Sequence, residues 1–446
     1  GDIIVTSLLF LEEHIRQIQP SLEARREACD AMAGIISDAA IVKLTKMGAL
    51  DMAAPSSGTM KFLKRLRGSS KPSTESGAKK MRMLRRLPRI LKYIPGKAQD
   101  LRAWFLTMQY WLAASDENVE GMVRHLISRY AREEAWLGAD VPQPQEYPDT
   151  GLYHPDLKGR ITTDVAKLPM PKKPAGTVGL LMMRSYVLSS DTAHYDAAIR
   201  ALEARGLRVI PAFAGGLDAR PAVDAFFRDA TGAKVDALLS LTGFSLIGGP
   251  AYNDNDAAIE VLRGLDIPYV GAHPLEFQTL GQWADSSQGL GPIETTMLIA
   301  LPELDGATNP TVFAGRHDQD GCSGCARICA GGSGRGMAAC PERIEVLADR
   351  MARQVALRRG KAKERKLAIV LFGFPPNAGA AGTAAYLDVF RSLHNTLHSL
   401  KAEGYDLEPP ETVEDLRAAV LGGTSKQYGQ EANIAAHVLA DDMVSN

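Results

Sequence analysis

Four of the five cysteines lie close together, as Cys322, Cys325, Cys329 and Cys340, and Pro341 follows the last of them. Iron–sulfur clusters take cysteine thiolates as ligands, and a Cys-Pro pair is a feature of ferredoxin-like ligand runs. Zinc accepts the same four sulfurs in a tetrahedron, although the first three cysteines are more crowded than in paired zinc knuckles. The spacing therefore predicts a metal centre, either a 4Fe–4S cluster or zinc, with free thiols as the third interpretation.

Histidines and carboxylates that could act as bases or as ligands of a divalent ion occur at several other places. They are His154 with Asp156, His273 with Glu276, Glu294, and His317 with Asp318 and Asp320. Side chains of these types more often serve as helix caps, surface ion pairs or satisfied core histidines. None of these sets predicts chemistry by itself. The fifth cysteine, Cys29, lies alone in a helical pattern and is expected to be a small buried hydrophobe.

The stretch from Thr242 to Pro250 is rich in glycine and apolar residues. Its glycines, Gly248 and Gly249 among them, would let the backbone approach a flat hydrophobic ligand closely, with Phe244 beside it. A tight turn without a ligand explains the same residues equally well. The stretch is therefore a candidate binding loop with a structural alternative.

Nucleotide chemistry can be tested by motif. No Gly-x-x-x-x-Gly-Lys-Ser/Thr run occurs in the sequence. The nearest dinucleotide fingerprint, at positions 334–339, follows the cysteines, where no strand is expected. If the system uses ATP, we expect another polypeptide to hydrolyse it.

A regular alternation of strands and capped helices begins at Thr177. Strands are expected at 178–183, 207–213, 235–241 and 268–270, and helices at 191–205, 218–227 and 254–264. Continuous apolar strands separated by helices of this length predict a parallel sheet covered on both faces. The fold class is therefore α/β, with doubly wound, flavodoxin-like parallel sheets. Ligands of such sheets bind outside the carboxyl ends of the strands. The loops expected there are 184–191, 214–218, 242–256 and 271–276.

The segments before this alternation predict smaller structures. Apolar runs at 2–10 and 39–44, with a polar helix-like stretch at 12–30 between them, indicate a partial β-α-β unit. Helical spacing from Leu101 to Trp136 indicates a helical insertion, a hairpin whose aromatic stripe is expected to be core. Lys61–Lys97 holds 13 basic residues and one acidic residue, and we expect a solvated linker.

After the sheet, Lys366 begins a fresh unit, with a strand at 367–374 and a helix at 383–401. We expect five regions in all. They are a partial α/β unit at 1–60, a basic linker at 61–100, a helical hairpin at 101–150, the doubly wound domain at 151–365 with its Cys-rich segment at 315–341, and the start of a further α/β domain at 366–446. The Pro-rich stretch 141–174 is expected to be an ordered linker.

Composition excludes some classes of protein. The chain is 45% hydrophobic and 23% charged with a net charge of -1, which is typical of a soluble globular protein. No apolar run is long enough to span a bilayer. We expect a cytoplasmic protein, with peripheral membrane association as the alternative, and no nucleic-acid partner. The first residue, a glycine, suggests a fragment of a longer chain.

Three stretches carry a resemblance to a known family. They are Leu371–Gly379 with Gly382–Asp388, Ser240–Ala251, and Tyr153–Leu157. They resemble the H subunit of magnesium chelatase and its relative, the large subunit of cobaltochelatase. The Pro-Pro-Asn turn that runs into Gly-Thr-Ala-Ala-Tyr-Leu-Asp is the most specific. The likeness covers nearly the whole chain, as an amino-terminal to middle portion of a much longer protein.

This resemblance implies a subunit that binds protoporphyrin IX during ATP-dependent insertion of Mg²⁺. It also implies two smaller partners of the AAA+ type that hydrolyse the ATP. The family's proposed metal-insertion acids lie mostly beyond this chain, so we expect the fragment to be inactive alone. His154, Asp156, Phe244, Gly248, Gly249, His273 and Glu276 are the weak candidates for contacting the substrate. The four cysteines depart from many family members.

Two alternatives stay open at this point. The first is a cobaltochelatase large subunit, which inserts cobalt into a corrinoid precursor. The wording of the Pro-Pro-Asn stretch favours the magnesium branch by a modest margin. The second is an iron–sulfur redox or sensor protein on a flavodoxin-like scaffold.

Overall fold

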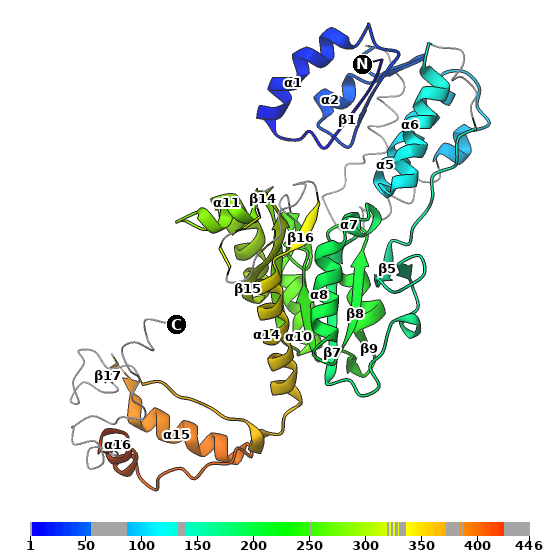
Figure 1. Ribbon diagram of the computed structural model, residues 1–446. Coiled ribbons are helices and arrows are strands. Elements are labelled where there is room, and N and C mark those ends of the chain that lie inside the picture. The colour runs from blue at the N-terminus through cyan, green and yellow to red at the C-terminus, as the bar shows by residue number, and fades with distance from the viewer. Residues whose placement is uncertain are drawn as a thin grey trace. The chain divides into compact units, whose positions relative to one another are not determined.

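The structure, a computed structural model, describes most of the chain (Figure 1). The described residues are 2–54, 87–132, 140–249, 252–318, 321–322, 324–325, 329, 336–371, 383–384 and 387–422. They fall into two compact units, Gly1–Val355 and Ala356–Asn446. Most of the basic linker and most of the Pro-Pro-Asn stretch lie outside the described residues. No described helix is long and apolar enough to cross a membrane.

The first strands form a small mixed sheet, and one strand assignment was wrong. β1 (Ile3–Ser7) pairs in parallel with β2 (Ala31–Ile35), and α1 (Glu12–Arg25) connects them. We expected the second strand at 39–44, but this segment is the short helix α2 (Ala39–Lys43). Asp38 explains the difference, because its side chain accepts a hydrogen bond from the amide of Ala40 and so caps the helix.

The helical hairpin forms as expected. It consists of α5 (Lys97–Ala113) and α6 (Asp116–Tyr130), and Ser115 caps the second helix by accepting from the amide of Asn118 at 3.3 Å. Trp104 on α5 is buried, and its indole N–H donates to the carbonyl of Gly34 at 3.0 Å. The aromatic stripe is therefore core, packed on the first sheet.

An eight-stranded sheet forms the centre of the first unit. The strand order is β16-β15-β14-β11-β7-β8-β5-β6, and the five strands from β15 to β8 are parallel. In chain order these five have the 2-1-3-4-5 arrangement of flavodoxin-like sheets. The expected fold class is confirmed. The strands are β5 (Thr150–Tyr153), β6 (Ile161–Thr162), β7 (Gly176–Met183), β8 (Leu207–Ala214), β11 (Ala237–Ser240), β14 (Tyr269–Thr279), β15 (Thr308–Arg316) and β16 (Met337–Ala339).

Both faces of this sheet are buried under helices (Figure 1). One face packs on α8 (Ala193–Glu203) and α14 (Pro341–Arg359), and the other on η3 (Val223–Phe227) and α10 (Asn255–Leu265). Successive side chains of β7 point to opposite faces of the sheet, because strand side chains alternate. That alternation explains why the strand is apolar throughout its length.

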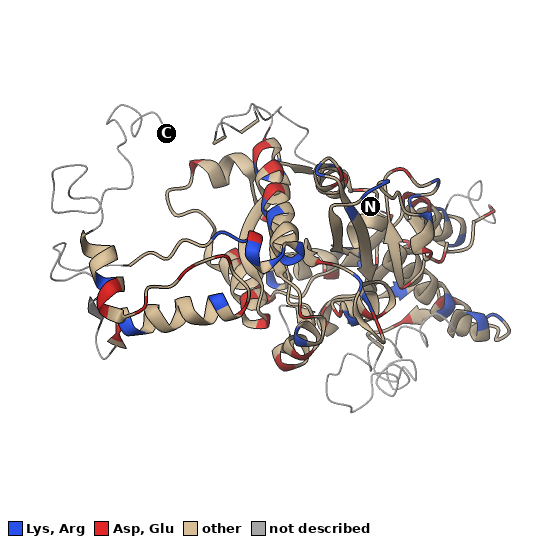
Figure 2. Ribbon diagram, turned by 90° about the horizontal axis from the view of Figure 1, so that it is seen from below, with Lys and Arg blue, Asp and Glu red and all other residues tan. Residues whose placement is uncertain are grey.

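Ion pairs add to this packing along the helices. The guanidinium of Arg205, just past α8, contacts Glu345 at 3.0 Å and Asp349 at 2.7 Å on α14. Figure 2 shows acidic and basic residues interspersed over the described ribbon. The two ion pairs of Arg205 orient α14 on α8, while apolar burial supplies most of the stabilisation.

The edges of the sheet differ from what the sequence suggested. The stretch 141–174 contributes β5 and β6, and β5 pairs antiparallel with β8. At Gly151 a side chain would lie 2.7 Å from the ring of Phe213, so glycine lets the ring cover the strand. The strand β15 and its antiparallel neighbour β16 were not expected at all.

The second unit contains α15 (Val389–Ala402), α16 (Val413–Gly422) and the short antiparallel pair β17 (Thr383–Ala384) and β18 (Leu387–Asp388). The helix begins later than expected because Asp388 caps it, accepting from the amide of Arg391 at 3.1 Å. The strand expected at 367–374 does not form over its described part, Leu367–Leu371. Among the described residues this segment has no strand partner.

The contact between the hairpin and the first sheet can be tested at one side chain. We expect Trp104→Ala to destabilise β2 by about 3–5 kcal/mol, because it removes a buried aromatic ring and the hydrogen bond to Gly34. Faster amide hydrogen exchange in Ala31–Ile35 would report the change. Tyr93→Ala is the control, since that ring is 83% exposed. Unchanged exchange in the Trp104 variant would contradict the packing described.

Candidate metal centre and the carboxyl edge of the sheet

Three cysteines meet beside β14 and β15. The Sγ atoms of Cys325 and Cys340 lie 3.3 Å apart, and these two and the Sγ of Cys329 all lie within 4.8 Å of one another. Among the described residues this is the one group of three or more Cys, His, Asp or Glu that could hold a metal ion. The structure therefore brings together three of the four cysteines that the spacing singled out.

Backbone contacts hold Cys322, Cys329 and Cys340 in place. Cys340 follows β16 and directly precedes α14; its amide donates to the carbonyl of Phe313 at 2.8 Å and its carbonyl accepts from Ile344 at 3.0 Å. Cys322 and Cys329 pair as an isolated antiparallel bridge, which places Cys322 beside the group. The thiols are thus presented by a strand end, a helix start and a bridge.

The surroundings of the thiols are apolar. Leu275, Leu280 and Val312 pack around Cys329 and Cys340, with the partly buried Trp283 beside them. Burial, together with the neighbouring thiols, raises the pKa of the Cys325 thiol to about 12 and that of Cys329 to about 11. A bound cation would offset this cost of ionisation, because metal ligation needs the thiolate form.

Glycine allows the backbone to approach the site closely. The amide of Gly324 lies 3.4 Å from the Sγ of Cys322 and donates to it. A Cβ at position 324 would lie 2.5 Å from the Cβ of Ala284, so this turn requires glycine. Amide donors of this kind stabilise metal-bound thiolates and tune the metal. The residues present therefore fit a metal centre.

His154 is a satisfied core histidine. Its Nδ1 accepts from the amide of Asp156 at 3.1 Å, so Nε2 carries the proton and donates to Glu203 at 3.0 Å. The side chain is fully buried. Arg200 binds both oxygens of Asp156 and thereby lowers the pKa of that carboxyl. Both side chains are therefore engaged by neighbours within the fold.

His273 and Glu276 both belong to β14, but only Glu276 has a side-chain partner among the described residues, since the buried Nε2 of His273 has none. Glu276 accepts a hydrogen bond from the hydroxyl of Tyr186 on the short helix α7 (Arg184–Leu188). Burial, with a smaller effect of the charge of Arg343, lowers the pKa of His273 to about 4. His273 is therefore neutral at physiological pH, and the two side chains do not form a pair.

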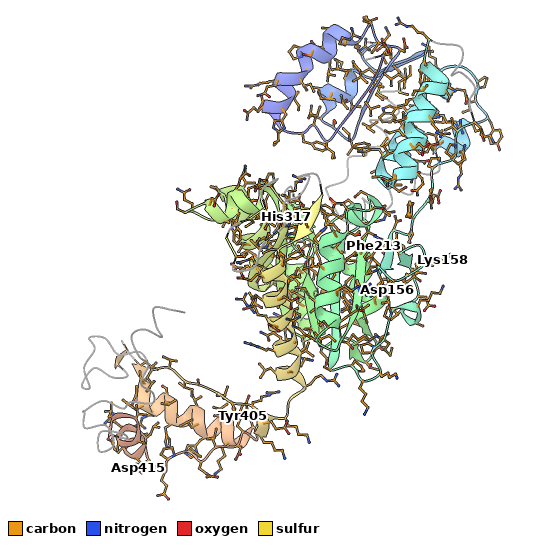
Figure 3. All side chains as sticks on the ribbon, in the orientation of Figure 1. Asp156, Lys158, Phe213, His317, Tyr405 and Asp415 are labelled. Atoms are coloured by element: carbon orange, nitrogen blue, oxygen red, sulfur yellow. The ribbon has the colours of Figure 1, made fainter. Side chains whose placement is uncertain are left out.

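The other carboxylates expected near this edge are also engaged. Glu294 is buried and accepts from the side chain of Gln278 at 2.6 Å and from the amide of Phe277 at 3.3 Å. Asp318 accepts from the hydroxyl of Thr279 at 2.7 Å, beside the buried His317, while Asp320 lies outside the described residues. His317 and Asp156 lie well apart on the central domain (Figure 3). The scattered candidates therefore do not converge on one site.

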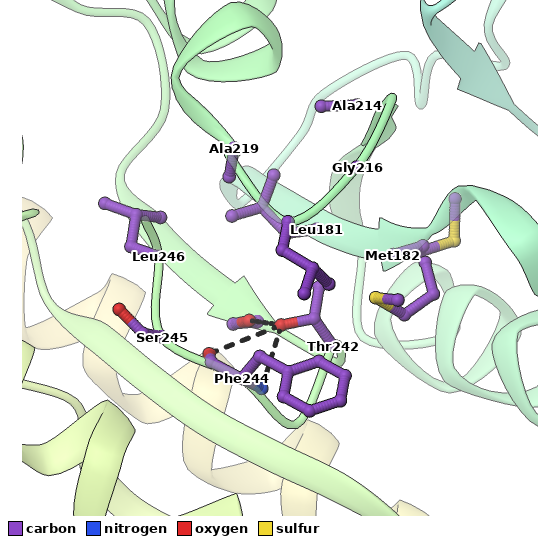
Figure 4. Close-up of a pocket in the computed structure, with 12 residues that line it drawn as sticks. Leu181, Met182, Ala214, Gly216, Ala219, Thr242, Phe244, Ser245 and Leu246 are labelled. Carbon is purple, nitrogen blue, oxygen red and sulfur yellow. Dashed lines mark hydrogen bonds between the residues drawn. The ribbon is translucent and has the colours of Figure 1, made fainter. Parts of the chain in front are cut away.

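The glycine-rich loop borders a crevice of about 360 Å³, including space open to solvent (Figure 4). It lies at the carboxyl ends of β7, β8 and β11, where the strand order reverses and such sheets bind ligands. Phe244 lines it, and Thr242 shapes the loop, because its hydroxyl accepts from the amide of Phe244 at 3.3 Å. The lining residues are Leu181, Met182, Met183, Ala214, Gly216, Leu217, Ala219, Ser240, Thr242, Phe244, Ser245 and Leu246.

Gly248 and Gly249 have structural reasons to be glycine. They form β12 (Gly248–Gly249), which pairs antiparallel with β13 (Tyr252–Asn253). Gly248 has a φ of 125°, and a Cβ at Gly249 would lie 2.2 Å from the side chain of Leu217. The loop is thus a packed turn, although Phe244 still faces the crevice.

Sequence reasoning missed Asp305, the residue that fixes this loop. It is buried on α13 (Leu301–Asp305), and one of its oxygens accepts from the hydroxyl of Ser245 and the amide of Leu246, each at 2.7 Å. Burial raises its pKa in spite of these donors. No sequence signal marks it, since the loop is some 60 residues away.

His194 was also missed. It is fully buried at the start of α8, its ring centroid 3.9 Å from that of Tyr195, and neither ring nitrogen has a hydrogen-bond partner among the described residues. Burial lowers its pKa to about 3. The imidazole therefore behaves as a neutral aromatic core residue.

Two family profiles match the chain. CobN/Magnesium Chelatase matches residues 108–443, and a domain of unknown function (DUF3479) matches residues 1–105. Together they cover nearly every described element.

Curated relatives extend this match. The magnesium-chelatase H subunit of Cereibacter sphaeroides is 62% identical over 449 aligned positions, covering 100% of this chain and 38% of the relative. Its counterpart in Rhodobacter capsulatus is 59% identical, with 100% and 37% covered. The aerobic cobaltochelatase CobN protein of Pseudomonas aeruginosa is 28% identical, with 71% and 24% covered. The chain thus spans well under half the length of these relatives.

Among solved structures, the catalytic subunit of cobaltochelatase from Mycobacterium tuberculosis aligns with a TM-score of 0.56 at 18% identity. The alignment covers 96% of this chain and 29% of that one. At this identity the likeness concerns the fold.

The buried imidazole of His194 gives a prediction about acid stability. An unfolded histidine titrates near 6.5, about three units above the folded value, so the unfolded state takes up the proton first as the pH falls. Stability is therefore lost from about pH 6.5 downwards. We expect His194→Phe to remove this loss, up to about 1.4 kcal/mol per pH unit, while keeping the stability at pH 8.

Urea midpoints measured between pH 8 and pH 4 would check this prediction. His14→Gln, at an exposed position on α1, is the control and should keep the wild-type profile. A His194→Phe protein as acid-sensitive as wild type would show that His194 does not cause the loss. A variant much less stable than wild type at pH 8 would show that the imidazole makes a polar contact.

Proposed function

This chain belongs to the CobN/magnesium chelatase family, and we propose that it forms part of the porphyrin-binding H subunit of a magnesium chelatase. The activity would be ATP-dependent insertion of Mg²⁺ into protoporphyrin IX, in the formation of chlorophyll or bacteriochlorophyll. The observation that carries the proposal is 62% identity along the whole chain to a magnesium-chelatase H subunit.

The choice of magnesium over cobalt rests on the same comparison. Identity falls from 62% to 28% between the magnesium-chelatase relative from Cereibacter sphaeroides and the cobaltochelatase relative from Pseudomonas aeruginosa. The covered share of this chain falls from 100% to 71%. This difference supports the magnesium branch and disfavours the cobaltochelatase alternative.

The proposed activity implies partner subunits and a cellular location. Two smaller AAA+ subunits would hydrolyse ATP, in keeping with a sequence that has no Gly-x-x-x-x-Gly-Lys-Ser/Thr loop. Mg²⁺ gives up its water reluctantly, which makes such an energy source useful. We propose a cytoplasmic location, with any membrane association peripheral.

Within that complex, this chain would serve as scaffold. Of the expected bases, His154, Asp156, Glu276 and Glu294 all have strong partners, so none is placed to accept pyrrole protons. Pockets that enclose drug-sized ligands have about 300–1,000 Å³. The crevice beside Phe244 leaves only about 20 Å³ for the centre of a water-sized sphere, far below that range. It suits contact with part of a flat ligand better than enclosure of a whole macrocycle.

We further propose that Cys322, Cys325, Cys329 and Cys340 hold a metal centre. The crowded spacing of the first three and the Cys-Pro that follows favour a 4Fe–4S cluster. When bound, such a cluster supplies a centre that accepts or gives up one electron. The chain's own contribution is an apolar pocket and the amide of Gly324, which donates to the Cys322 sulfur.

A single zinc ion is the second candidate, and one observation favours it. Sulfurs at about 2.3 Å from zinc in a tetrahedron lie about 3.8 Å apart. The three grouped sulfurs lie within 4.8 Å of one another, and one pair is at 3.3 Å. A four-iron cluster is larger and would need the thiols to lie further apart.

The chelatase proposal can be tested in a full-length protein. We expect a Cereibacter sphaeroides H subunit whose aligned segment is replaced by this chain to form Mg-protoporphyrin with its two partners and ATP. Identity of 62% should keep the junctions compatible. The parent protein is the positive control, and omission of ATP is the negative one. A folded chimera that binds protoporphyrin IX but inserts no Mg²⁺ would count against the proposal.

The metal centre gives a separate prediction. Cys325→Ser should remove most of the bound metal from protein purified without oxygen, because its sulfur lies 3.3 Å from that of Cys340. Cys29→Ser, a buried cysteine with its Sγ near the carbonyl of Arg26, is the matched control and should keep the metal. Iron with acid-labile sulfide would identify a cluster, and zinc alone would exclude it. Equal metal content in both variants would refute the site.

A further inference from the structure

Two histidines face each other on α15 of the second unit, which holds none of the sites described so far. His394 and His398 are four residues apart and therefore lie on the same side of the helix. Their Nε2 atoms are 3.3 Å apart, and their ring centroids 4.5 Å apart. The pair thus directs two imidazole nitrogens at one point in space.

A carbonyl oxygen completes the arrangement. The oxygen of Pro410 lies 2.8 Å from the Nε2 of His394. Pro410 belongs to the segment between α15 and α16, so the three groups connect a helix to the chain that follows it. The Nε2 of His394 therefore lies within 3.3 Å of a second imidazole nitrogen and within 2.8 Å of a carbonyl oxygen from another segment.

Hydrogen bonds alone satisfy these three groups poorly, because one proton must serve both acceptors. A carbonyl can only accept, so the Nε2 of His394 must carry the proton and donate it to Pro410. The Nε2 of His398 then faces the same N–H and has to share it, because a proton of its own would point at another proton. A cation in that position would instead take a lone pair from each of the three groups.

The distances suit such a cation. With metal–nitrogen bonds of about 2.1 Å, a separation of 3.3 Å between nitrogens gives a ligand–metal–ligand angle of about 105°, close to tetrahedral. The 2.8 Å separation between Nε2 of His394 and the oxygen of Pro410 gives about 85° with bonds of similar length, an angle found in five- and six-coordinate sites. Water can occupy the open positions, since His398 is exposed.

We propose that His394, His398 and the carbonyl of Pro410 form a binding site for a divalent transition-metal ion of the Zn²⁺, Co²⁺ or Ni²⁺ class. Imidazole suits these ions, whereas Mg²⁺ prefers oxygen ligands in a near-ideal octahedron. The site discriminates against the ion that the proposed reaction uses. It is independent of the cysteine centre, since it lies in a different unit and uses different ligands.

Occupancy of this site has a structural consequence. The bound ion would join α15 to the segment that leads into α16, on which α15 also packs. A ligand that binds the folded form alone stabilises that form. Metal binding should therefore protect the amides of α15 and α16 from hydrogen exchange.

Calorimetric titration of the 446-residue chain with Ni²⁺ tests the proposal. His398→Ala is the informative variant, because its ring is exposed and its described hydrogen-bond partner is His394, so the fold should persist. His14→Ala, an exposed histidine on α1, is the matched control. The four cysteines are present in all three proteins, so the difference between the isotherms isolates the histidine site.

We expect one binding event to disappear from the His398→Ala isotherm and to persist in wild type and in His14→Ala. Excess Mg²⁺ should leave that event unchanged, and Ni²⁺ should slow amide exchange in α15 and α16 of wild type and His14→Ala but not of His398→Ala. Co²⁺ bound there should give weak visible bands without the sulfur charge-transfer absorption of a thiolate site. Identical isotherms for wild type and His398→Ala, or displacement of Ni²⁺ by Mg²⁺, would overturn the proposal.

Discussion

Burial of the central sheet on both faces decides where this chain can carry chemistry. Helices α8 and α14 cover one face and η3 and α10 the other, so the side chains of β7 are committed to packing. Reactive groups can then lie only beyond the strands or at the sheet's edge. The crevice beside Phe244, the hydrogen bond between Tyr186 and Glu276, and the cysteines next to β15 all lie there. The geometry of every candidate site on this sheet follows from that single constraint.

The sequence predicted this sheet well because the signals were local. Continuous apolar strands, the cap at Asp254 and the glycine after α8 each act within a few residues. The antiparallel edge strand β5 and the partner pair β15 and β16 were missed, since their pairing depends on residues far along the chain. The strand wrongly placed at 39–44 has a different cause, because a local cap at Asp38 outweighed an apolar run.

The candidate sites also divide into those that local sequence could predict and those that it could not. Grouping of the cysteines could be predicted because their ligand spacing is a property of the chain itself. The isolated histidines could not be assigned, because a partner such as Glu203 for His154 becomes visible only in the fold. Asp305 acts on a loop some 60 residues away and left no signal. The result is a scaffold whose polar groups are mostly engaged, beside an apolar cysteine pocket suited to a cation.

The proposed metal centre of four thiols beside β15 can be tested by spectroscopy. X-ray absorption at the iron and zinc edges, on His398→Ala protein purified without oxygen, is the direct test, because this variant lacks the proposed histidine site. The account predicts a first shell made of sulfur alone, at about 2.3 Å, with a nearby iron neighbour if the centre is a cluster and none if it is zinc. A first shell of nitrogen or oxygen, or protein with neither metal bound, would contradict it.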